Sequence, residues 1–381
     1  MKRRIITSLL LSFVLILSAF SFLGCSEANT DYYTLSDDGT FYSFTGSAEF
    51  AETEYTILSE IKGIPVTEIG QAALSQNNTI TKITIPDSIT KMRNNAFSKC
   101  GALTEVSIGA GVTTIPESAF AGCSKLSTVI FSEGLEKINR NAFTNCIKLD
   151  NISFPSTITT LGEKAFYRCR GLSTITLPEN LTKIENSCFE ECSGLTEITI
   201  NKTLDVISNN CFKNCSKVTK INFATDGVLE VINNSAFFNL SSLEEVTFPD
   251  SLKGIKASAF FNCKALRKVT FGKGIEYIGG SVSTTAGGAF AEIVAEEDKP
   301  TDKAHILEMI FPEEAIGYGW YPTLDPYGPM CNRSYGAEGL DDLYFLTPEE
   351  IRNNEARQQL CQNMTGYSWF KCKTPNPDHA V

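Results

Sequence analysis

Apolar residues recur along the middle of the chain with a period of 23 residues. Phenylalanine marks this period most clearly, and Leu74 holds the same phase one period before the first phenylalanine. The marked positions are Phe97, Phe120, Phe143, Phe166, Phe189, Phe212, Phe237, Phe260 and Phe290, with longer steps before Phe237 and Phe290. A fixed period of this length is typical of a solenoid, in which similar units stack along one axis.

Each unit combines two extended segments with one short turn segment. Val106 and Ile108 alternate with polar residues, which predicts a first short strand. The apolar pair Val112 and Ile115 predicts a second extended segment. In several units a proline ends the first strand because it cannot donate a backbone hydrogen bond: Pro86, Pro155, Pro178 and Pro249. The A-F-x-x-C segment has helical spacing and room for about one helical turn, and Asn141 lies where a cap is favoured.

One unit cannot bury its own apolar face, whereas stacked units can. The first strands of successive units are expected to pair edge to edge about 4.8 Å apart. These strands are expected to begin at Ile80, Leu103, Leu126, Leu149, Leu172, Leu195, Val218, Leu243 and Leu266. Two degenerate copies follow, around Met309 and Leu343, which would extend the rod to roughly 50 Å.

The period and the A-F-x-x-C signature resemble the BspA-like leucine-rich repeats of bacterial surface proteins. The segment 64–70 is also similar to the usual first repeat of that family, and the resemblance covers residues 57–295 closely and 296–350 weakly. It implies a leucine-rich-repeat solenoid: stacked 23-residue coils with a parallel sheet of short strands, short helical turns, second short extended segments and an irregular C-terminal cap. It also implies cell-surface adhesins and interaction proteins, some of which bind host matrix glycoproteins, and no catalytic residues.

The N-terminus has the layout of a secretory signal peptide. Three basic residues, Lys2 to Arg4, precede an apolar run over residues 5–20, which is short for the alternative of a transmembrane helix. The tripeptide Leu23-Gly24-Cys25 then resembles a bacterial lipobox, although Phe22 stands where leucine is commoner. This resemblance implies that Cys25 becomes the lipid-modified first residue, which would anchor the protein at the outer membrane or cell surface.

These features divide the chain into four expected parts. Residues 1–24 are the lipoprotein signal peptide, and residues 25–45 are the lipidated cysteine and a polar tether. Residues 46–295 form the solenoid. Residues 296–381 hold the degenerate repeats and an aromatic-rich cap.

Most of the thirteen cysteines are expected to be buried free thiols. One repeat position is held by Cys100, Cys123, Cys146, Cys169, Cys192, Cys215 and Cys263. Leu240 fills that position in one unit, which marks it as an apolar core site where cysteine acts as a small hydrophobe. Cys188 and Cys211 replace the small alanine of the repeat, so no metal or cofactor is expected there. Scattered disulfides between neighbouring coils, or one among Cys331, Cys361 and Cys372, remain open.

Charge and composition exclude two classes of function. The formal net charge is −11, and loss of the first 24 residues, which hold three basic and no acidic residues, makes it −14. Such a chain lacks the clustered Lys and Arg that nucleic acid requires. His305 and His379 are the only histidines, and the sequence contains no G-x-S-x-G, H-E-x-x-H or phosphate-loop motif. We therefore expect neither nucleic-acid binding nor an enzyme.

Two groups of residues are candidates for ligand binding. The residue between the last two apolar positions of each strand should point outward, which forms a polar strip: Thr84, Ser107, Ser153, Thr176, Thr199, Asn222, Thr247 and Thr270. Threonine also simply suits an exposed strand, so a structural role is the alternative. The second group is the aromatic C-terminal region with Trp320, Tyr321 and Trp369, which either caps the last coil or contacts a ligand.

The predicted function is that of a lipid-anchored, adhesin-like surface protein. Its expected partners are proteins, such as host extracellular-matrix or plasma glycoproteins, bound through the repeat face or the C-terminal cap. Membrane contact is expected through the lipid anchor only. The alternative is a structural envelope lipoprotein, or spacer, without a host ligand.

Overall fold

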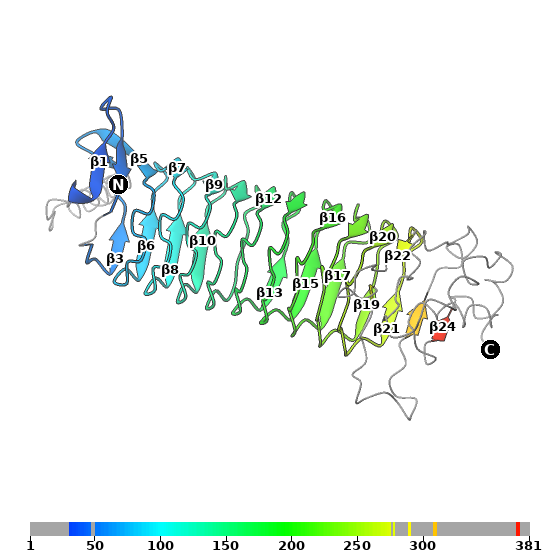
Figure 1. Ribbon diagram of the computed structural model, residues 1–381. Coiled ribbons are helices and arrows are strands. Elements are labelled where there is room, and N and C mark those ends of the chain that lie inside the picture. Colours follow the sequence, from blue (N-terminus) through cyan, green and yellow to red (C-terminus); the bar gives the residue numbers. More distant parts are fainter. Residues whose placement is uncertain are drawn as a thin grey trace, which may run out of the picture.

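The chain folds into a rod of stacked coils, as the 23-residue period predicts. The computed structural model describes residues 30–46, 50–275, 277–278, 289–290, 308–310 and 371–373. Most coils contribute one strand to each of two long faces, and the coils follow one another along the rod in sequence order (Figure 1). The predicted solenoid of parallel strands is therefore confirmed.

The first strands of the repeats form the face that we call the front sheet. Its strands pair in parallel in three groups. The groups are β3 (Glu54–Thr56), β6 (Lys82–Ile85), β8 (Glu105–Ile108) and β10 (Thr128–Phe131); then β13 (Thr174–Thr176), β15 (Glu197–Ile200) and β17 (Lys220–Phe223); then β19 (Glu245–Thr247), β21 (Lys268–Thr270), β23 (Glu308–Ile310) and β24 (Lys371–Lys373). The expected strand after Leu149 is absent, since residues 150–154 are not in strand conformation.

The second, shorter strands form the back sheet. At the N-terminal end, β5 (Ile64–Ile69) pairs with β7 (Lys91–Met92). Two further groups follow: β9 (Thr114–Ile115), β11 (Lys137–Ile138), β12 (Thr160–Leu161) and β14 (Lys183–Ile184); then β16 (Val206–Ile207), β18 (Val231–Ile232), β20 (Gly254–Ile255) and β22 (Tyr277–Ile278). Pairing in both sheets joins residues at the same position of adjacent repeats, as in Val106↔Ile83. Each repeat position therefore becomes a column along the rod.

A stack of phenylalanine rings runs through the core. The repeat phenylalanines from Phe97 to Phe260 are fully buried, and Phe290 is almost so. Ring centroids of successive coils lie 5.1–5.5 Å apart. All but one pair of rings lies within 9° of parallel. The offset contact of aromatic rings adds to the burial of their large apolar area.

The A-F-x-x-C segments do not form the expected helical turns. Two residues in each segment, such as Asn141 and Asn145, adopt positive φ, at 56° and 61°. A right-handed helix cannot continue through such residues. The backbone instead turns its N–H groups along the rod, so that the N–H of Phe143 donates to the carbonyl of Ala165 in the next coil over 2.8 Å. Equivalent bonds join successive coils from Phe97 to Phe260.

The cysteine column is buried and reduced, as predicted. The nine cysteines from Cys100 to Cys263 are free and buried. In six of the seven coils the thiol of the repeat column donates to the carbonyl of the phenylalanine 26 residues earlier, as from Cys169 to Phe143 over 3.2 Å. The same contact recurs in five other coils, and the Cys100 thiol donates to the carbonyl of Leu74 at the same repeat position over 3.0 Å. Cysteine therefore fits this position both as a small apolar group and as a weak donor. Burial raises the pKa of the Cys263 thiol to about 12.

The N-terminal boundary of the folded part differs from the expectation. Residues 30–45 were expected in the tether, but they contain η1 (Thr30–Tyr32), β1 (Tyr33–Leu35) and β2 (Tyr42–Phe44). The two strands form an antiparallel hairpin, and β2 pairs with β5 of the first repeat. Buried aromatic side chains from this hairpin cover the open end of the first coil, which a solenoid requires.

That aromatic cap is held by a pair of tyrosine hydroxyls. Tyr33 accepts a hydrogen bond from the backbone N–H of Leu58 over 2.8 Å, and its hydroxyl lies 2.9 Å from that of Tyr55. The hairpin is closed on the other side by β4 (Glu60–Ile61), which pairs antiparallel with β5. The predominantly polar composition of residues 26–45 led to the prediction of a tether, although the segment contains the buried residues Tyr32, Tyr33 and Phe44.

At the other end, one of the two degenerate copies is confirmed. β23 contains Met309 and pairs with β21 in the register of the repeat. The next strand is β24, which is formed by residues 371–373 and not by the copy expected around Leu343. Residues 340–345, like most of the expected C-terminal cap, lie outside the described residues.

Replacing Phe166 with alanine should lower the free energy of unfolding by about 3–5 kcal/mol, because a large buried ring leaves a cavity in a stack that cannot collapse. Chemical denaturation of the variant and the parent chain measures the difference. Thr174→Ala is the control. Thr174 is an exposed residue of the front strand that follows Phe166 in the chain, so its loss should change stability little. Equal effects of the two substitutions would contradict the stacked core.

The buried thiols should react with iodoacetamide only when the rod unfolds, because burial both shields them and disfavours the reactive thiolate. Mass-spectrometric mapping in native buffer should find Cys146 and Cys169 unlabelled, and denaturant should expose both. Ile147→Cys supplies a positive control, since Ile147 is 41% exposed directly beside Cys146. Rapid labelling of Cys146 in native buffer would show that this column is open.

Candidate functional site

The polar strip predicted from the sequence lies on the outer surface of the front sheet. Its members are partly or fully exposed, while the apolar residues beside them, such as Ile83 and Ile85, are buried. Ser153 lies in the coil that lacks a front strand. Ile130 interrupts the strip as an exposed apolar side chain, 51% accessible. The other candidates, Cys25, Trp320, Tyr321 and Trp369, lie outside the described residues.

A column of hydroxyl groups runs beside the strip, one residue before most front strands. Five of these hydroxyls donate to the carbonyl of the same position in the preceding coil, as from Thr104 to Thr81 over 2.9 Å. Thr81, Ser127, Thr196 and Thr219 repeat this contact at 2.8–3.2 Å. These bonds reinforce the backbone pairing of neighbouring coils.

The front sheet is interrupted where a carboxylate replaces this hydroxyl. Asp150 holds the position between β10 and β13, and Glu244 holds it between β17 and β19. A carboxylate cannot donate to the carbonyl below it, and both are acceptors that repel. Arg267 also replaces the hydroxyl, but its backbone N–H donates to Glu244 over 2.7 Å and β19 pairs with β21. An acidic residue therefore stands at each of the two breaks.

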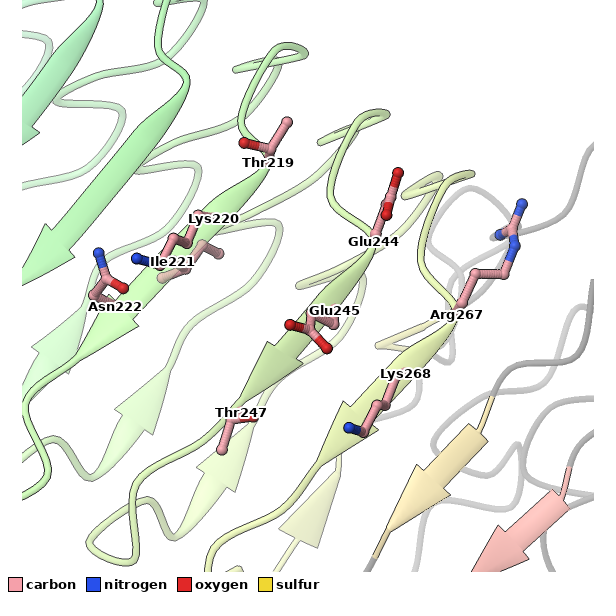
Figure 2. A pocket seen from close by; sticks show the side chains of 9 residues that line it. All are labelled: Thr219, Lys220, Ile221, Asn222, Glu244, Glu245, Thr247, Arg267 and Lys268. Carbon is pink, nitrogen blue, oxygen red and sulfur yellow. The ribbon is translucent and has the colours of Figure 1, made fainter.

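The second break opens a groove on the front sheet. The groove encloses about 670 Å³. It is lined by Thr219, Lys220, Ile221, Asn222, Glu244, Glu245, Thr247, Arg267 and Lys268. Figure 2 shows Lys220, Glu245 and Lys268 in one row across the three strands, with Thr219, Glu244 and Arg267 in a second row where the strands begin. Two residues of the predicted strip, Asn222 and Thr247, are thus brought together in one hollow.

The two walls of the groove differ in the surroundings of their charged side chains. Lys220 lies 3.3 Å from Glu197 on its N-terminal side, and the Asn222 amide donates to the same carboxylate over 2.6 Å. The amide and the lysine hold the pKa of Glu197 below its usual value. Glu245 and Lys268 are exposed on the opposite wall. The groove therefore offers both signs of charge beside amide and hydroxyl groups.

These charges belong to a longer pattern that we call the charge column. It contains, from the N-terminal end, Glu54, Lys82, Glu105, Thr128, Asn151, Thr174, Glu197, Lys220, Glu245 and Lys268. Acidic and basic residues alternate on each side of three uncharged central positions. Nine of these residues hold one position of the sequence repeat, whereas Glu54 joins the column by pairing with Lys82 across 28 residues, outside the repeat period.

A second cluster lies on the turns, where the sequence predicted no site. Glu191 accepts hydrogen bonds from Arg168 over 2.8 Å and from the Tyr167 hydroxyl over 2.9 Å, and Arg170 lies 3.2 Å away. These donors, Arg168 above all, lower the pKa of Glu191 to about 2. The cluster is internally satisfied. The cluster could have been found from the sequence at the two variable positions that follow each repeat phenylalanine, which hold Arg168 in one repeat and Glu191 in the next.

Within the described part of the chain, no group of three or more His, Cys, Asp or Glu side chains is arranged to hold a metal ion. No helix there is long and apolar enough to cross a membrane. What the described residues do present is a long polar sheet face with the groove between β17 and β19.

A rod of parallel strands built on a 23-residue, leucine-rich unit defines the chain as a leucine-rich-repeat protein. The model of the BspA type leucine rich repeat region matches six copies, over residues 45–173 and 159–284. The chain belongs to this family. No curated protein matches it.

Solved structures similar to this chain come from bacterial leucine-rich-repeat proteins. The T. pallidum protein TpLRR is 23% identical, with 55% of this chain and 86% of that chain covered and a TM-score of 0.43. A protein from Bacteroides ovatus is 18% identical, with coverage of 74% and 93% and a TM-score of 0.35. The pneumococcal vaccine antigen PcpA is 19% identical, with coverage of 74% and 92% and a TM-score of 0.37. The family assignment rests on the repeat match and not on these likenesses.

Glu244→Thr should restore the hydroxyl column across the second break and raise the free energy of unfolding by about 1 kcal/mol, the usual worth of one hydrogen bond. Hydrogen exchange should show slower exchange of the backbone amides of 245–247. Asp150→Thr is the matched variant at the first break, and it should give a similar gain without slowing exchange at 245–247. An unchanged or lower stability of both variants would mean that the carboxylates do not cause the breaks.

Proposed function

We propose that this chain is a lipid-anchored bacterial surface protein that binds a protein ligand in the groove between β17 and β19. The observation that carries the proposal is the groove itself, which lies at one of the two breaks of the front sheet and is lined by charged, amide and hydroxyl groups. It does not follow from stacking, because stacking alone would close the sheet. A feature that departs from the repeat while the core beneath it stays regular is a reasonable place for function.

The chemistry of the groove suits a protein surface better than a sugar or a nucleic acid. Lys220, Arg267 and Lys268 lie beside Glu244 and Glu245, so neither sign dominates. A polyanion would meet the carboxylates, and the lining has no aromatic ring on which a sugar could stack. Mixed charges and amides on a protein partner could pair with both rows, which favours register and specificity.

The surface location and the anchor are part of the proposal. Their support is the signal-like N-terminus ending in Leu23-Gly24-Cys25, together with membership of a repeat family typical of bacterial surface proteins. Protease added to intact cells should remove an outward-facing rod. A rod that survives this treatment would favour the alternative, a structural envelope lipoprotein whose long, regular shape serves as a spacer.

Binding is best measured with the purified full chain in detergent micelles against immobilised host matrix and plasma glycoproteins at several salt concentrations. Saturable binding to one or a few of them is expected. Lys268→Glu should weaken that binding about tenfold by reversing one charged wall. Lys137→Glu, an equally exposed change on the back sheet, should leave it unchanged.

The variants that close the breaks give the sharper comparison. Glu244→Thr should stabilise the rod and weaken ligand binding, whereas Asp150→Thr should stabilise it and leave binding intact. Because both gain stability, loss of binding in one cannot be attributed to misfolding. Equal binding by both closed variants would place the ligand elsewhere on the rod. No saturable binding by the folded parent chain would leave the structural role as the better proposal.

A further inference from the structure

We propose that one partner of the groove is a second copy of this chain, docked front sheet against front sheet with the two rods antiparallel. The inference rests on the proposed function, since it names an occupant of the same site. It is carried by the charge column, in which six of the seven charged residues face an opposite charge when the column is set against its own reverse.

The geometry of two facing sheets allows two symmetric arrangements. A two-fold axis along the rod would place each coil opposite itself, so every acidic residue of the column would face its own copy. A two-fold axis along the strands makes the two rods antiparallel. The N-terminal end of the charge column in one copy then faces the C-terminal end of the column in the other copy. Only the second arrangement brings unlike charges together, because the alternation places acidic and basic residues at opposite parities along the ten positions.

In the antiparallel arrangement the charged ends of the column all find an opposite charge. Glu54 faces Lys268, Lys82 faces Glu245, and Glu105 faces Lys220. Each contact occurs twice, once on each side of the axis. At the centre Asn151 faces Thr174, and Thr128 faces Glu197, so no like charges are forced together there.

The shape of the face matches this pairing. Lys82 and Glu105 form an ion pair of 2.8 Å that stands on two adjacent strands. In the antiparallel arrangement this pair lies opposite Lys220 and Glu245, the two residues that face each other across the groove. One copy therefore offers a pair of long side chains where the other offers a hollow. The short side chains of the strip, such as Ser107 and Thr199, let the two sheets approach.

The arrangement has a consequence for anchored copies. Antiparallel rods place their N-termini at opposite ends of the pair. Two chains anchored through Cys25 would then reach toward each other from two facing membranes, which is the arrangement that joins cells. Two chains on one flat membrane stand parallel, where the column opposes pairing.

Charge reversal tests the contact between Glu105 and Lys220. In sedimentation of the full chain in detergent, the parent should self-associate, and Lys220→Glu and Glu105→Lys should each raise the dissociation constant at least about tenfold. An equimolar mixture of the two variants should regain association, because every reversed residue then faces a reversed partner. Lys137→Glu on the back sheet is the control and should behave as the parent.

A zero-length carbodiimide cross-link between Glu105 and Lys220 supplies independent evidence. Within one chain these residues are five coils apart, about 24 Å, so a peptide joining them must come from two copies. A parent chain that stays monomeric, a mixture that does not recover, or cross-linked dimers without this peptide would overturn the proposal. If self-association fails while a glycoprotein still binds the groove, the proposed function stands and only this partner is wrong. If the chain self-associates but binds no glycoprotein, the second copy stands as the partner of the groove and the glycoprotein ligand is wrong.

Discussion

Every feature of this rod depends on the stacking of one buried phenylalanine ring on the next. Rings 5.1–5.5 Å apart require each coil to begin where the last one did, which is why the period stays at 23 residues through most of the chain. The turn backbone serves the same step, because the N–H of each phenylalanine bonds to the next coil. Where the chain inserts two residues between Phe212 and Phe237, the rings still stack at 5.5 Å. The surface loop absorbs the insertion.

Stacking at a fixed step turns single substitutions into surface features. A residue type repeated at one position becomes a column, and a change in one coil becomes a local break in that column. The hydroxyls that donate from coil to coil hold the front sheet closed, and a carboxylate at Asp150 or Glu244 coincides with each interruption. The groove thus lies where one column changes its side-chain chemistry and the repeat lengthens by two residues, while the phenylalanine stack beneath it continues.

The sequence predicted the features that recur with the repeat period, and it did not predict those that depend on strand pairing outside the repeat. Val106, Ile108 and the cysteine column were recognisable because identical environments recur every coil. The turn segments looked helical because Phe143 and Cys146 are three residues apart, and the positive φ of Asn145 shows only in the structure. The hairpin at Tyr33 and the alternation that begins at Glu54 arise from pairing outside the repeat. Of the polar strip, only Asn222 and Thr247 line the groove. They do so because the break in the front sheet lies between their strands, β17 and β19, and the repeat pattern of the strip itself does not mark that break.

A rod can tolerate such a break only if other connections continue through the same level. In the described coils the back sheet is interrupted between β7 and β9 and between β14 and β16, and the front sheet is interrupted at other levels. Phe212 still stacks on Phe237 and bonds to Ala236 over 2.8 Å, and β18 pairs with β20, at and beside the groove. Each level therefore keeps the phenylalanine stack and at least one sheet. Because cooperative stability passes between neighbouring repeats, a binding site can be opened on one face without dividing the solenoid in two.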